Sequence, residues 1–248
     1  MALLAAIRTV LIQPTHPGNV GGAARALKNM GLEQLYLVAP RNYPSPEAKA
    51  RAADAGDVLD RAIVCKDLDE AIGACHFVVG TTARSRRIDW PVLDPSACAI
   101  RLFEEATQGP VAVLFGQERR GLTNAELDRC HALVRIPSSP AYPSLNLVCA
   151  VQILAYEIYR SSLAHSPPTA SPAEPPASDE EMVRFYRHLE DVLRATEFLD
   201  PANPRLLLRR LHRLFNRARP DQNEINILRG ILTSIERKLG KLDRNSTE

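Results

Sequence analysis

The stretch from Val134 to Arg160 reads VRIPSSPAYPSLNLVCAVQILAYEIYR and joins a short apolar run, a proline-rich loop and a long apolar segment. The three prolines of the loop fix their own φ angles and favour extended geometry in the residues before them, which predicts a stiff, non-helical connection. From Leu145 to Tyr159 strongly polar residues are scarce, so we expect a helix buried on most sides, in a core or a subunit interface. Ser144 stands where the cap of this helix belongs.

Upstream of this stretch, short β-rich runs alternate with helical segments, which is typical of a mainly parallel sheet flanked by helices. The expected fold class is therefore α/β. One helix should run from near Asn19 to Gly31, and Asp67 with Glu70 stands at capping-box spacing before another. The predicted strands are Thr9 to Ile12, Gln34 to Val38, Ala62 to Cys65, Phe77 to Gly80, Val111 to Phe115 and Leu133 to Ile136.

The composition changes after Ala164. Residues 165–178, HSPPTASPAEPPAS, are too poor in apolar side chains to pack and too rich in proline to be helical, so they predict a linker between domains at 1–164 and 179–248. Three helix starts are then expected in the second domain, which should form a small helical module ending near Gly240. The start signals are Ser178 with Glu181, Asn203 before Pro204, and Asp221 with Glu224.

The middle helix of this module has the clearest charge pattern in the chain. No acidic residue occurs between Arg205 and Arg219, and leucines form the opposite stripe. Such a face attracts phosphate, but it could equally be solvated and paired with Glu190, Asp221 and Glu224 on neighbouring helices. The arginines that recur at every fourth position are Arg205, Arg209, Arg213 and Arg217.

Composition excludes several classes of protein. The chain has 248 residues and a formal charge of +2, too small a charge to indicate a polyanionic partner by itself. Its five cysteines are odd in number and widely spaced, so they predict neither a disulfide framework nor a zinc site but core residues in a reducing cytosol. We expect no signal peptide, because the N-terminal apolar run lacks a basic region and is interrupted by Arg8, and no membrane span.

A glycine-rich turn follows the first predicted strand. Its sequence, QPTHPGNVGGAAR at residues 13–25, exposes backbone N–H groups at a helix start and could bind an anion. This pattern suggests a dinucleotide-binding fold, but the glycine spacing is not GxGxxG and the second strand ends in Ala39, Pro40 and Arg41 rather than a ribose-binding acid. Arg25 is unusual here, because a charged side chain in an alanine-rich, tightly packed helix start must contact either solvent or a ligand.

Two further loops follow predicted strands. Residues 80–87, GTTARSRR, offer two hydroxyl groups and Arg84, Arg86 and Arg87, which would contact nucleic-acid phosphates if they are not simply in solvent. Residues 116–122, GQERRGL, allow a tight turn around a glutamate. Because ligands bind at the carboxyl ends of parallel strands, these loops and the proline-rich loop predict one site.

Glu118 lies in the second of these loops, beside Arg119 and Arg120. A carboxylate in this position is either part of an ordered ion pair or a hydrogen-bond acceptor for a ligand or another loop. The sequence leaves both possibilities open.

Three groups of residues carry a resemblance to a known family. They are Asn19-x-Gly21-x-x-Ala24-Arg25, then Phe115-Gly116-x-Glu118-x-x-Gly121-Leu122, then Ile136-Pro137 followed by Ser144-Leu145-Asn146. Together they resemble the motifs of the SPOUT methyltransferases of the TrmH type. The segments TTARSR and YPSLNL and the C-terminal RLFNRARP and NEINILRGILTSIE are similar to those of family members that methylate the ribose of nucleotide 32 in the tRNA anticodon loop.

The resemblance implies a more specific fold than the alternation does. It implies a Rossmann-like, mainly parallel sheet with a deep C-terminal trefoil knot, a rare topology, plus a small all-α C-terminal domain. It also implies S-adenosyl-L-methionine as cofactor, bound within the knot by the backbone of three loops. The residues expected to bind it are Thr81, Thr82, Ala83, Gly116, Ile136, Ser144, Leu145 and Asn146.

Catalytic residues and assembly are implied as well. Arg25 is credited with activating the 2′-hydroxyl, while Asn19, Glu118, Ser144 and Asn146 shape the site. Because an arginine keeps its proton near neutral pH, we expect Arg25 to bind the adjoining phosphate and stabilise the developing alkoxide rather than act as a simple base. Family members are dimers packed through the first and last helices of the domain, with Arg25 serving the partner's pocket.

We therefore expect a cytoplasmic, homodimeric tRNA ribose 2′-O-methyltransferase that acts on cytidine, uridine or both at position 32 and uses no metal. Its C-terminal helices would hold RNA through the arginine stripe. Two alternatives remain: a ribosomal RNA 2′-O-methyltransferase of the same fold, and a catalytically silent RNA-binding protein. The second is disfavoured because every motif position carries the expected type of residue.

Overall fold

The chain divides into two compact units, Met1–Ser171 and Pro172–Glu248. The first contains the sheet, and the described part of the second contains helices and one isolated β-bridge. The structure is a computed structural model that describes residues 2–83, 90–164, 176–200, 202 and 206–245.

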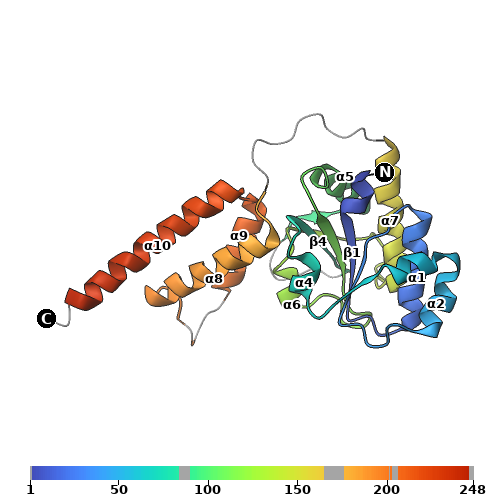
Figure 1. The fold of residues 1–248 in the computed structure, drawn as a ribbon, viewed down its shortest axis with the longest axis horizontal. Helices are drawn as coiled ribbons and strands as arrows, with labels where there is room; N and C mark the ends of the chain where they lie inside the picture. The colour runs from blue at the N-terminus through green and yellow to red at the C-terminus, as the bar shows by residue number, and fades with distance from the viewer. Residues whose placement is uncertain (1, 84–89, 165–175, 201, 203–205, 246–248) are drawn as a thin grey trace. The chain divides into compact units, whose positions relative to one another are not determined.

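The first unit is built on a seven-stranded sheet, counted over the described residues, in the order β3-β2-β1-β6-β4-β7-β5. All the strand pairs are parallel. Helices lie on both faces, with α1, α2 and α7 on one side and α4 and α6 on the other (Figure 1). The strands are β1 Ile7–Ile12, β2 Leu35–Val38, β3 Ile63–Cys65, β4 Phe77–Thr81, β5 Val92–Leu93, β6 Val111–Phe115 and β7 Ala132–Val134.

All six predicted strands are present, with ends that differ by up to two residues. The predicted α/β class is confirmed, and the central strands are apolar on both faces because helices cover both. Strand β5 was not predicted, since a pair of residues gives no recognisable β-rich run. It exists because Val92 and Leu93 pair with Leu133 and Val134 of β7.

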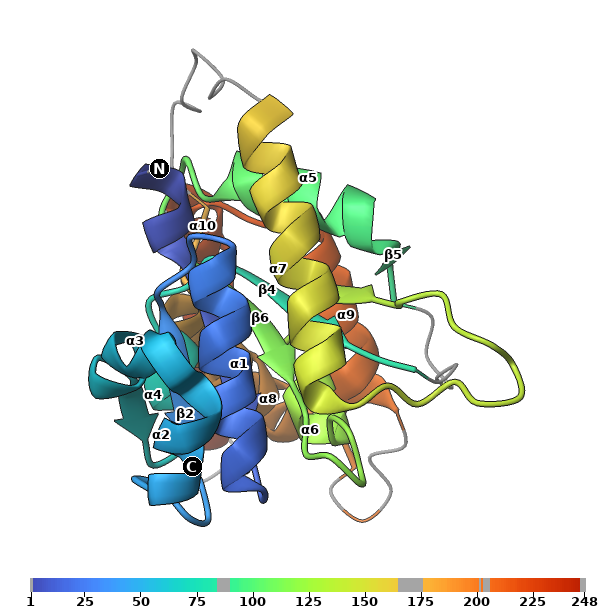
Figure 2. The same cartoon turned by 90° about the vertical axis from the view of Figure 1, so that its right-hand side faces the viewer.

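The helices of the first unit pack closely where the chain supplies glycine. Helices α1 and α7 lie side by side across the sheet (Figure 2). A Cβ atom on Gly22 would lie 2.8 Å from a methyl group of Val148, and one on Gly21 would lie 2.1 Å from the carbonyl oxygen of Ala48 in α2. The helices are α1 Pro17–Asn29, α2 Pro46–Ala52, α3 Gly56–Asp60, α4 Leu68–Ile72, α5 Pro95–Glu105, α6 Asn124–Leu127 and α7 Leu147–Ala164.

The cap of α7 differs from the prediction. The helix begins at Leu147, and the side-chain oxygen of Asn146 accepts a hydrogen bond from the backbone N–H of Val148 at 2.8 Å. Asn146 is therefore the N-terminal cap, and the assignment of that role to Ser144 was wrong. The proline-rich loop continues through Ser144 and Leu145 before the chain turns into the helix.

Only one face of α7 is covered within the chain. Leu147, Val151 and Leu154 are buried, whereas Tyr156 is 50% exposed and Leu163 is 72% exposed. The expectation of a helix buried on most sides is therefore not met by a single chain, and an apolar outer face remains in solvent.

The second unit consists of α8 Asp179–Ala195, α9 Leu207–Ala218 and α10 Gln222–Asn245 in its described part. Both caps predicted for the described part of this unit are present: Ser178 and Glu181 form a capping box, and the carboxylate of Asp221 accepts from the N–H of Glu224 at 2.8 Å. The predicted start at Asn203 and Pro204 lies outside the described residues.

Two boundaries of the second unit differ from the predictions. Helix α10 continues past Gly240 to Asn245, because a glycine without positive φ can remain helical. The last residues of the predicted linker belong to the helical unit: Pro176 forms a β-bridge with Asp221, and the N–H of Ala177 donates to the carbonyl of Pro220 at 3.0 Å. None of the described helices is long and apolar enough to span a membrane.

Candidate functional site

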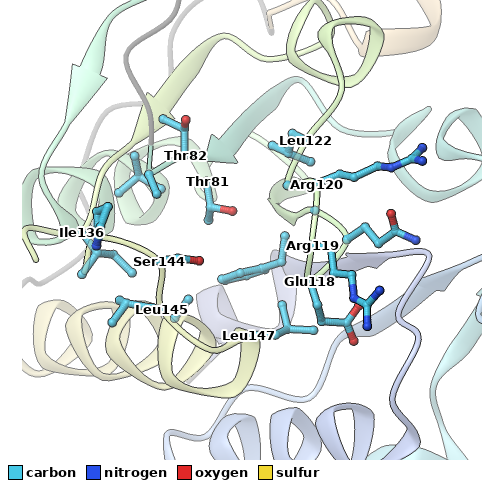
Figure 3. Close-up of a pocket in the computed structure, with 18 residues that line it drawn as sticks. Thr81, Thr82, Glu118, Arg119, Arg120, Leu122, Ile136, Ser144, Leu145 and Leu147 are labelled. Carbon is cyan, nitrogen blue, oxygen red and sulfur yellow. The ribbon is translucent and has the colours of Figure 1, made fainter. Parts of the chain in front are cut away.

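A cavity opens at the carboxyl ends of β4, β6 and β7, where the predicted loops converge (Figure 3). The cavity is open to solvent, and its space of about 840 Å³ includes the solvent at its mouth. The lining residues are Thr81 at the end of β4 with Thr82 and Ala83 after it, Phe115 at the end of β6 with Gly116 to Leu122 after it, Val134 at the end of β7 with Ile136 after it, and Pro143, Ser144, Leu145, Leu147 and Ala150 around the start of α7.

All the residues expected to bind the cofactor line this cavity except Asn146, which caps α7 instead. The hydroxyl of Thr81 donates to the carbonyl of Leu114 at 2.9 Å and so holds the end of β4 to that of β6. In Figure 3 the hydroxyl groups of Thr81 and Ser144 both point into the enclosed space.

The sequence left open whether Glu118 forms an ion pair or accepts hydrogen bonds from a ligand or another loop, and the structure shows its partners. Its carboxylate accepts hydrogen bonds from the backbone N–H of Thr15 at 3.1 Å, from the Thr15 hydroxyl at 2.9 Å and from the N–H of His16 at 3.3 Å. These donors precede the first residue of α1, where backbone N–H groups have no partner within the helix. Glu118 is therefore an acceptor for another loop, and it occupies the anion site that the glycine-rich turn predicts.

The surroundings of Glu118 also shift its ionisation. Burial raises the pKa of Glu118, but hydrogen bonds from its own backbone, Asn19, His16 and Thr15 outweigh burial and hold the pKa below the ordinary value for a glutamate. The ionised form is thus the one that the folded structure stabilises.

A second contact extends this link to the third loop. The amide of Asn19 donates to Glu118 at 3.2 Å, and its oxygen accepts from the amide of Asn146 at 3.5 Å. The motif residues Asn19, Glu118 and Asn146 therefore form one chain of hydrogen bonds across three loops. Neither Asn19 nor Asn146 lines the cavity of this chain.

The loop after β6 turns tightly. A Cβ atom on Gly116 would lie 2.2 Å from the carbonyl carbon of Gly121, so only glycine fits there without moving the backbone. The N–H of Gly121 donates to the carbonyl of Gln117 at 2.7 Å, and Gly121 has a φ of +67°. Both glycines are therefore required by the shape of the turn, as the sequence suggested.

Arg25 lies on α1, is exposed and does not line the cavity of its own chain. A single chain therefore does not assemble Arg25 with the other expected catalytic residues.

The expected RNA-binding arginines are only partly described. Arg84, Arg86, Arg87 and Arg205 lie outside the described residues. On α9, Arg209 and Arg213 are half-buried and Arg217 is exposed. The acids that could have neutralised the stripe have other contacts.

Those acids are Glu190, Asp221 and Glu224. Glu190 pairs with Arg194 at 2.5 Å, while Asp221 and Glu224 cap α10 through reciprocal hydrogen bonds to each other's backbone. Each of the three acids therefore has a partner outside α9.

Sequence reasoning missed several lining residues. Phe115, Leu122, Val134 and Leu147 supply apolar walls, and Arg119 and Arg120 stand at the rim. Phe115 and Leu122 are themselves motif positions and the others lie within two residues of one, so their place in or beside the motifs was the available signal. Among the described residues no group of three or more His, Cys, Asp and Glu side chains could hold a metal ion.

Comparisons with known sequences identify two families. The model of the SpoU rRNA Methylase family matches residues 6–156, and that of the tRNA methyltransferase TrmJ C-terminal domain matches residues 180–244. A protein of Sodalis glossinidius called tRNA (cytidine/uridine-2′-O-)-methyltransferase TrmJ is 51% identical over 93% of this chain and 91% of its own length.

Solved structures show the same architecture. The crystal structure of TrmJ from Z. mobilis ZM4 is similar with a TM-score of 0.82 and 35% identity, over 92% of this chain and 98% of that one. A structure described as giving insights into the 2-OH methylation of C/U34 on tRNA has a TM-score of 0.52 and 29% identity, over 64% of this chain and 97% of that one.

Replacing Glu118 tests the contact between the loops. We expect Glu118→Gln to lower the free energy of unfolding by about 2 kcal/mol at pH 7, because the glutamine carries no charge and turns an N–H₂ group toward N–H donors. The folded state lowers the pKa of Glu118, so this stability is present above the ordinary glutamate pKa and is lost as pH falls through the folded value.

The difference between the variant and the unsubstituted chain should therefore shrink below about pH 4 in denaturant titrations. Glu104→Gln is the matched control. The carboxylate of Glu104 is half-exposed and lies 3.8 Å from the guanidinium of Arg101, a long and exposed ion pair that contributes little stability. A difference for Glu118→Gln that is the same at pH 3 and pH 7 would contradict the assignment.

Proposed function

Because the chain belongs to the SpoU rRNA methylase family, we propose that it transfers a methyl group from S-adenosyl-L-methionine to the ribose 2′-hydroxyl of nucleotide 32 in the tRNA anticodon loop. The observation that carries the choice of tRNA is the match of residues 180–244 to the TrmJ C-terminal domain, beyond the catalytic domain that ribosomal RNA enzymes also have. The relatives called TrmJ act on cytidine and uridine by name, so we propose both as targets.

The cavity fits the proposed cofactor. Its walls combine apolar side chains such as Leu122 and Ile136 with the hydroxyls of Thr81 and Ser144 and the backbone of three loops. S-adenosyl-L-methionine, when bound, supplies the electrophilic methyl group of a sulfonium. This chain's residues would hold the cofactor, exclude water from it and align the ribose, and alignment alone can contribute several kcal/mol, up to about 7–11.

Arg25 is proposed as the residue that acts on the ribose. A guanidinium remains protonated near neutral pH, so its role is to bind the adjoining phosphate and stabilise negative charge that develops on the 2′-oxygen. Asn19, Glu118 and Asn146 would position the loops through their hydrogen-bond chain, and Ser144 would face the ligands.

We propose a homodimer in which Arg25 serves the pocket of the partner chain. The outer face of α7 supports this assembly, because Cys149, Tyr156, Tyr159 and Leu163 recur at helical spacing and are all exposed. An apolar face of this kind is typical of a helix that packs against another subunit. Arg25 on the neighbouring α1 is likewise exposed, where a second chain can reach it.

The proposed topology is a deep trefoil knot in a methyltransferase domain of residues 1–164. The strand order supports it, because β7 is inserted between β4 and β5, two strands that precede it in the chain. We place the end of the linker, predicted to span residues 165 to 178, before Pro176. Pro176 forms a β-bridge with Asp221 and is therefore part of the helical unit. Residues 179–248 would hold RNA through α9.

Methyl transfer to RNA tests the proposed function. We expect labelled S-adenosyl-L-methionine to methylate total tRNA and not ribosomal RNA, with mass spectrometry placing the methyl group on ribose 32. A tRNA with 2′-deoxyribose at that position is the control and should accept none. Transfer to ribosomal RNA alone would establish the alternative substrate, and modification at nucleotide 34 would move the target within the loop.

Mixed dimers test the shared active site. Arg25→Ala should lower kcat by about a hundredfold or more with S-adenosyl-L-methionine binding retained, since it removes a charge that acts on the reacting oxygen. Gly116→Ala should weaken cofactor binding, because the added Cβ would lie 2.2 Å from Gly121. A purified heterodimer of the two variants has both substitutions in one pocket and none in the other. It should therefore recover about half of the wild-type rate.

The two parent homodimers serve as controls and should both transfer methyl groups far more slowly than the wild-type dimer. Inactive heterodimers, formed from parents that dimerise normally, would show that Arg25 acts within its own chain.

Salt dependence tests the role of α9. Arg210→Gln with Arg217→Gln removes two exposed charges, so the slope of log affinity for tRNA against log salt should fall by about 1 to 2. Arg237→Gln on α10, also exposed, is the single-charge control. An unchanged slope in the double variant would favour a merely solvated face.

A further inference from the structure

The tip of the loop between β6 and α6 carries three charged residues, of which only the first is engaged. Glu118 is bound by donors at the start of α1. Arg119 and Arg120 are exposed, line the rim of the cavity and, among the residues that the structure describes, form no hydrogen bond or ion pair. Two guanidinium groups without such contacts thus stand at the rim of the proposed cofactor site.

The loop holds these arginines in place before any ligand binds. The bridge between Gln117 and Gly121 closes the turn below them, and the carboxylate of Glu118 fixes the tip to α1. A ligand that binds to this tip therefore need not order the backbone, which lowers the entropic penalty of binding. The negative charge of Glu118 is offset by its N–H donors and the helix N-terminus.

The direction of the side chains separates two possible ligands, the carboxylate of the cofactor and the phosphates of the RNA. Figure 3 shows the side chains of Arg119 and Arg120 extending from the loop away from Thr81 and Ser144, whose hydroxyls point into the enclosed space. Both guanidinium groups are therefore directed away from the enclosed space.

We propose that Arg119 and Arg120 are positioning residues that bind the RNA phosphates flanking the target ribose. The inference rests on the proposed function, because it assumes that the ribose reaches the cavity through this mouth. Planar guanidinium groups match phosphate oxygens with paired hydrogen bonds. Two such contacts on a fixed turn would set the register of the RNA strand and so select which ribose meets the methyl group.

The experiment compares charge-removing and charge-retaining variants in the full chain. Arg119→Gln with Arg120→Gln removes both charges, and Arg119→Lys with Arg120→Lys keeps them without the fork geometry. Arg61→Gln is the control for charge alone, because Arg61 is also exposed but precedes β3, at the opposite edge of the sheet, where it pairs with Glu33 and Asp57. The probes are a synthetic anticodon stem-loop RNA, whole tRNA and S-adenosyl-L-methionine alone.

We expect the double glutamine variant to weaken binding of the stem-loop about tenfold and to lower its salt slope by about 1.4, the value for two contacts to a single strand. The lysine variant should keep the salt slope yet raise KM, since lysine lacks the paired donors. The affinity for S-adenosyl-L-methionine and the melting temperature should remain those of the unsubstituted chain in both variants. Arg61→Gln should keep the affinities for the stem-loop and for S-adenosyl-L-methionine.

Two results would overturn the inference. One is stem-loop affinity and salt slope that do not change in the double glutamine variant. The other is an equal loss of affinity for S-adenosyl-L-methionine, which would assign the arginines to the cofactor. Methyl transfer by the unsubstituted chain tests the proposed function separately, and the RNA-binding measurements decide the role of the two arginines whatever that result.

Discussion

The contact on which the site most depends joins a carboxylate to the start of a helix. Glu118 satisfies N–H groups before α1 that have no partner inside the helix, and Asn19 carries the link on to Asn146 at the start of α7. The chain's own carboxylate therefore occupies the position before α1 where the glycine-rich turn could bind an anion. The helix N-terminus instead organises the loops.

Much of the sheet could be predicted, for a physical reason. Strands covered by helices on both faces are continuous apolar runs, as in residues 111–115, and such runs stand out in a sequence. The cavity could also be predicted, because Gly116, Gly121 and the prolines after Ile136 restrict the backbone at the ends of these strands. Local chain geometry and position in a parallel sheet were enough to bring these loops together.

The remaining features depend on partners far away in the chain or outside it. Thr15 meets Glu118 across 103 positions, and no local pattern encodes that pairing. Ser144 and Asn146 are both good caps, so only the path of the loop decides between them. The place of Arg25 in a site is still harder to predict. Its side chain is exposed in the single chain, and local sequence patterns do not show how a second chain would pack against it.

The edges of the sheet carry one more consequence. Strands β3 and β5 form the two edges and span only Ile63–Cys65 and Val92–Leu93, although Val64 is 51% exposed and apolar. A long, exposed and apolar edge strand would offer its unpaired backbone N–H and C=O groups to strands of other molecules. Edges this short leave too few such groups to template a foreign strand, so the sheet is protected against edge-to-edge aggregation by length rather than by charge.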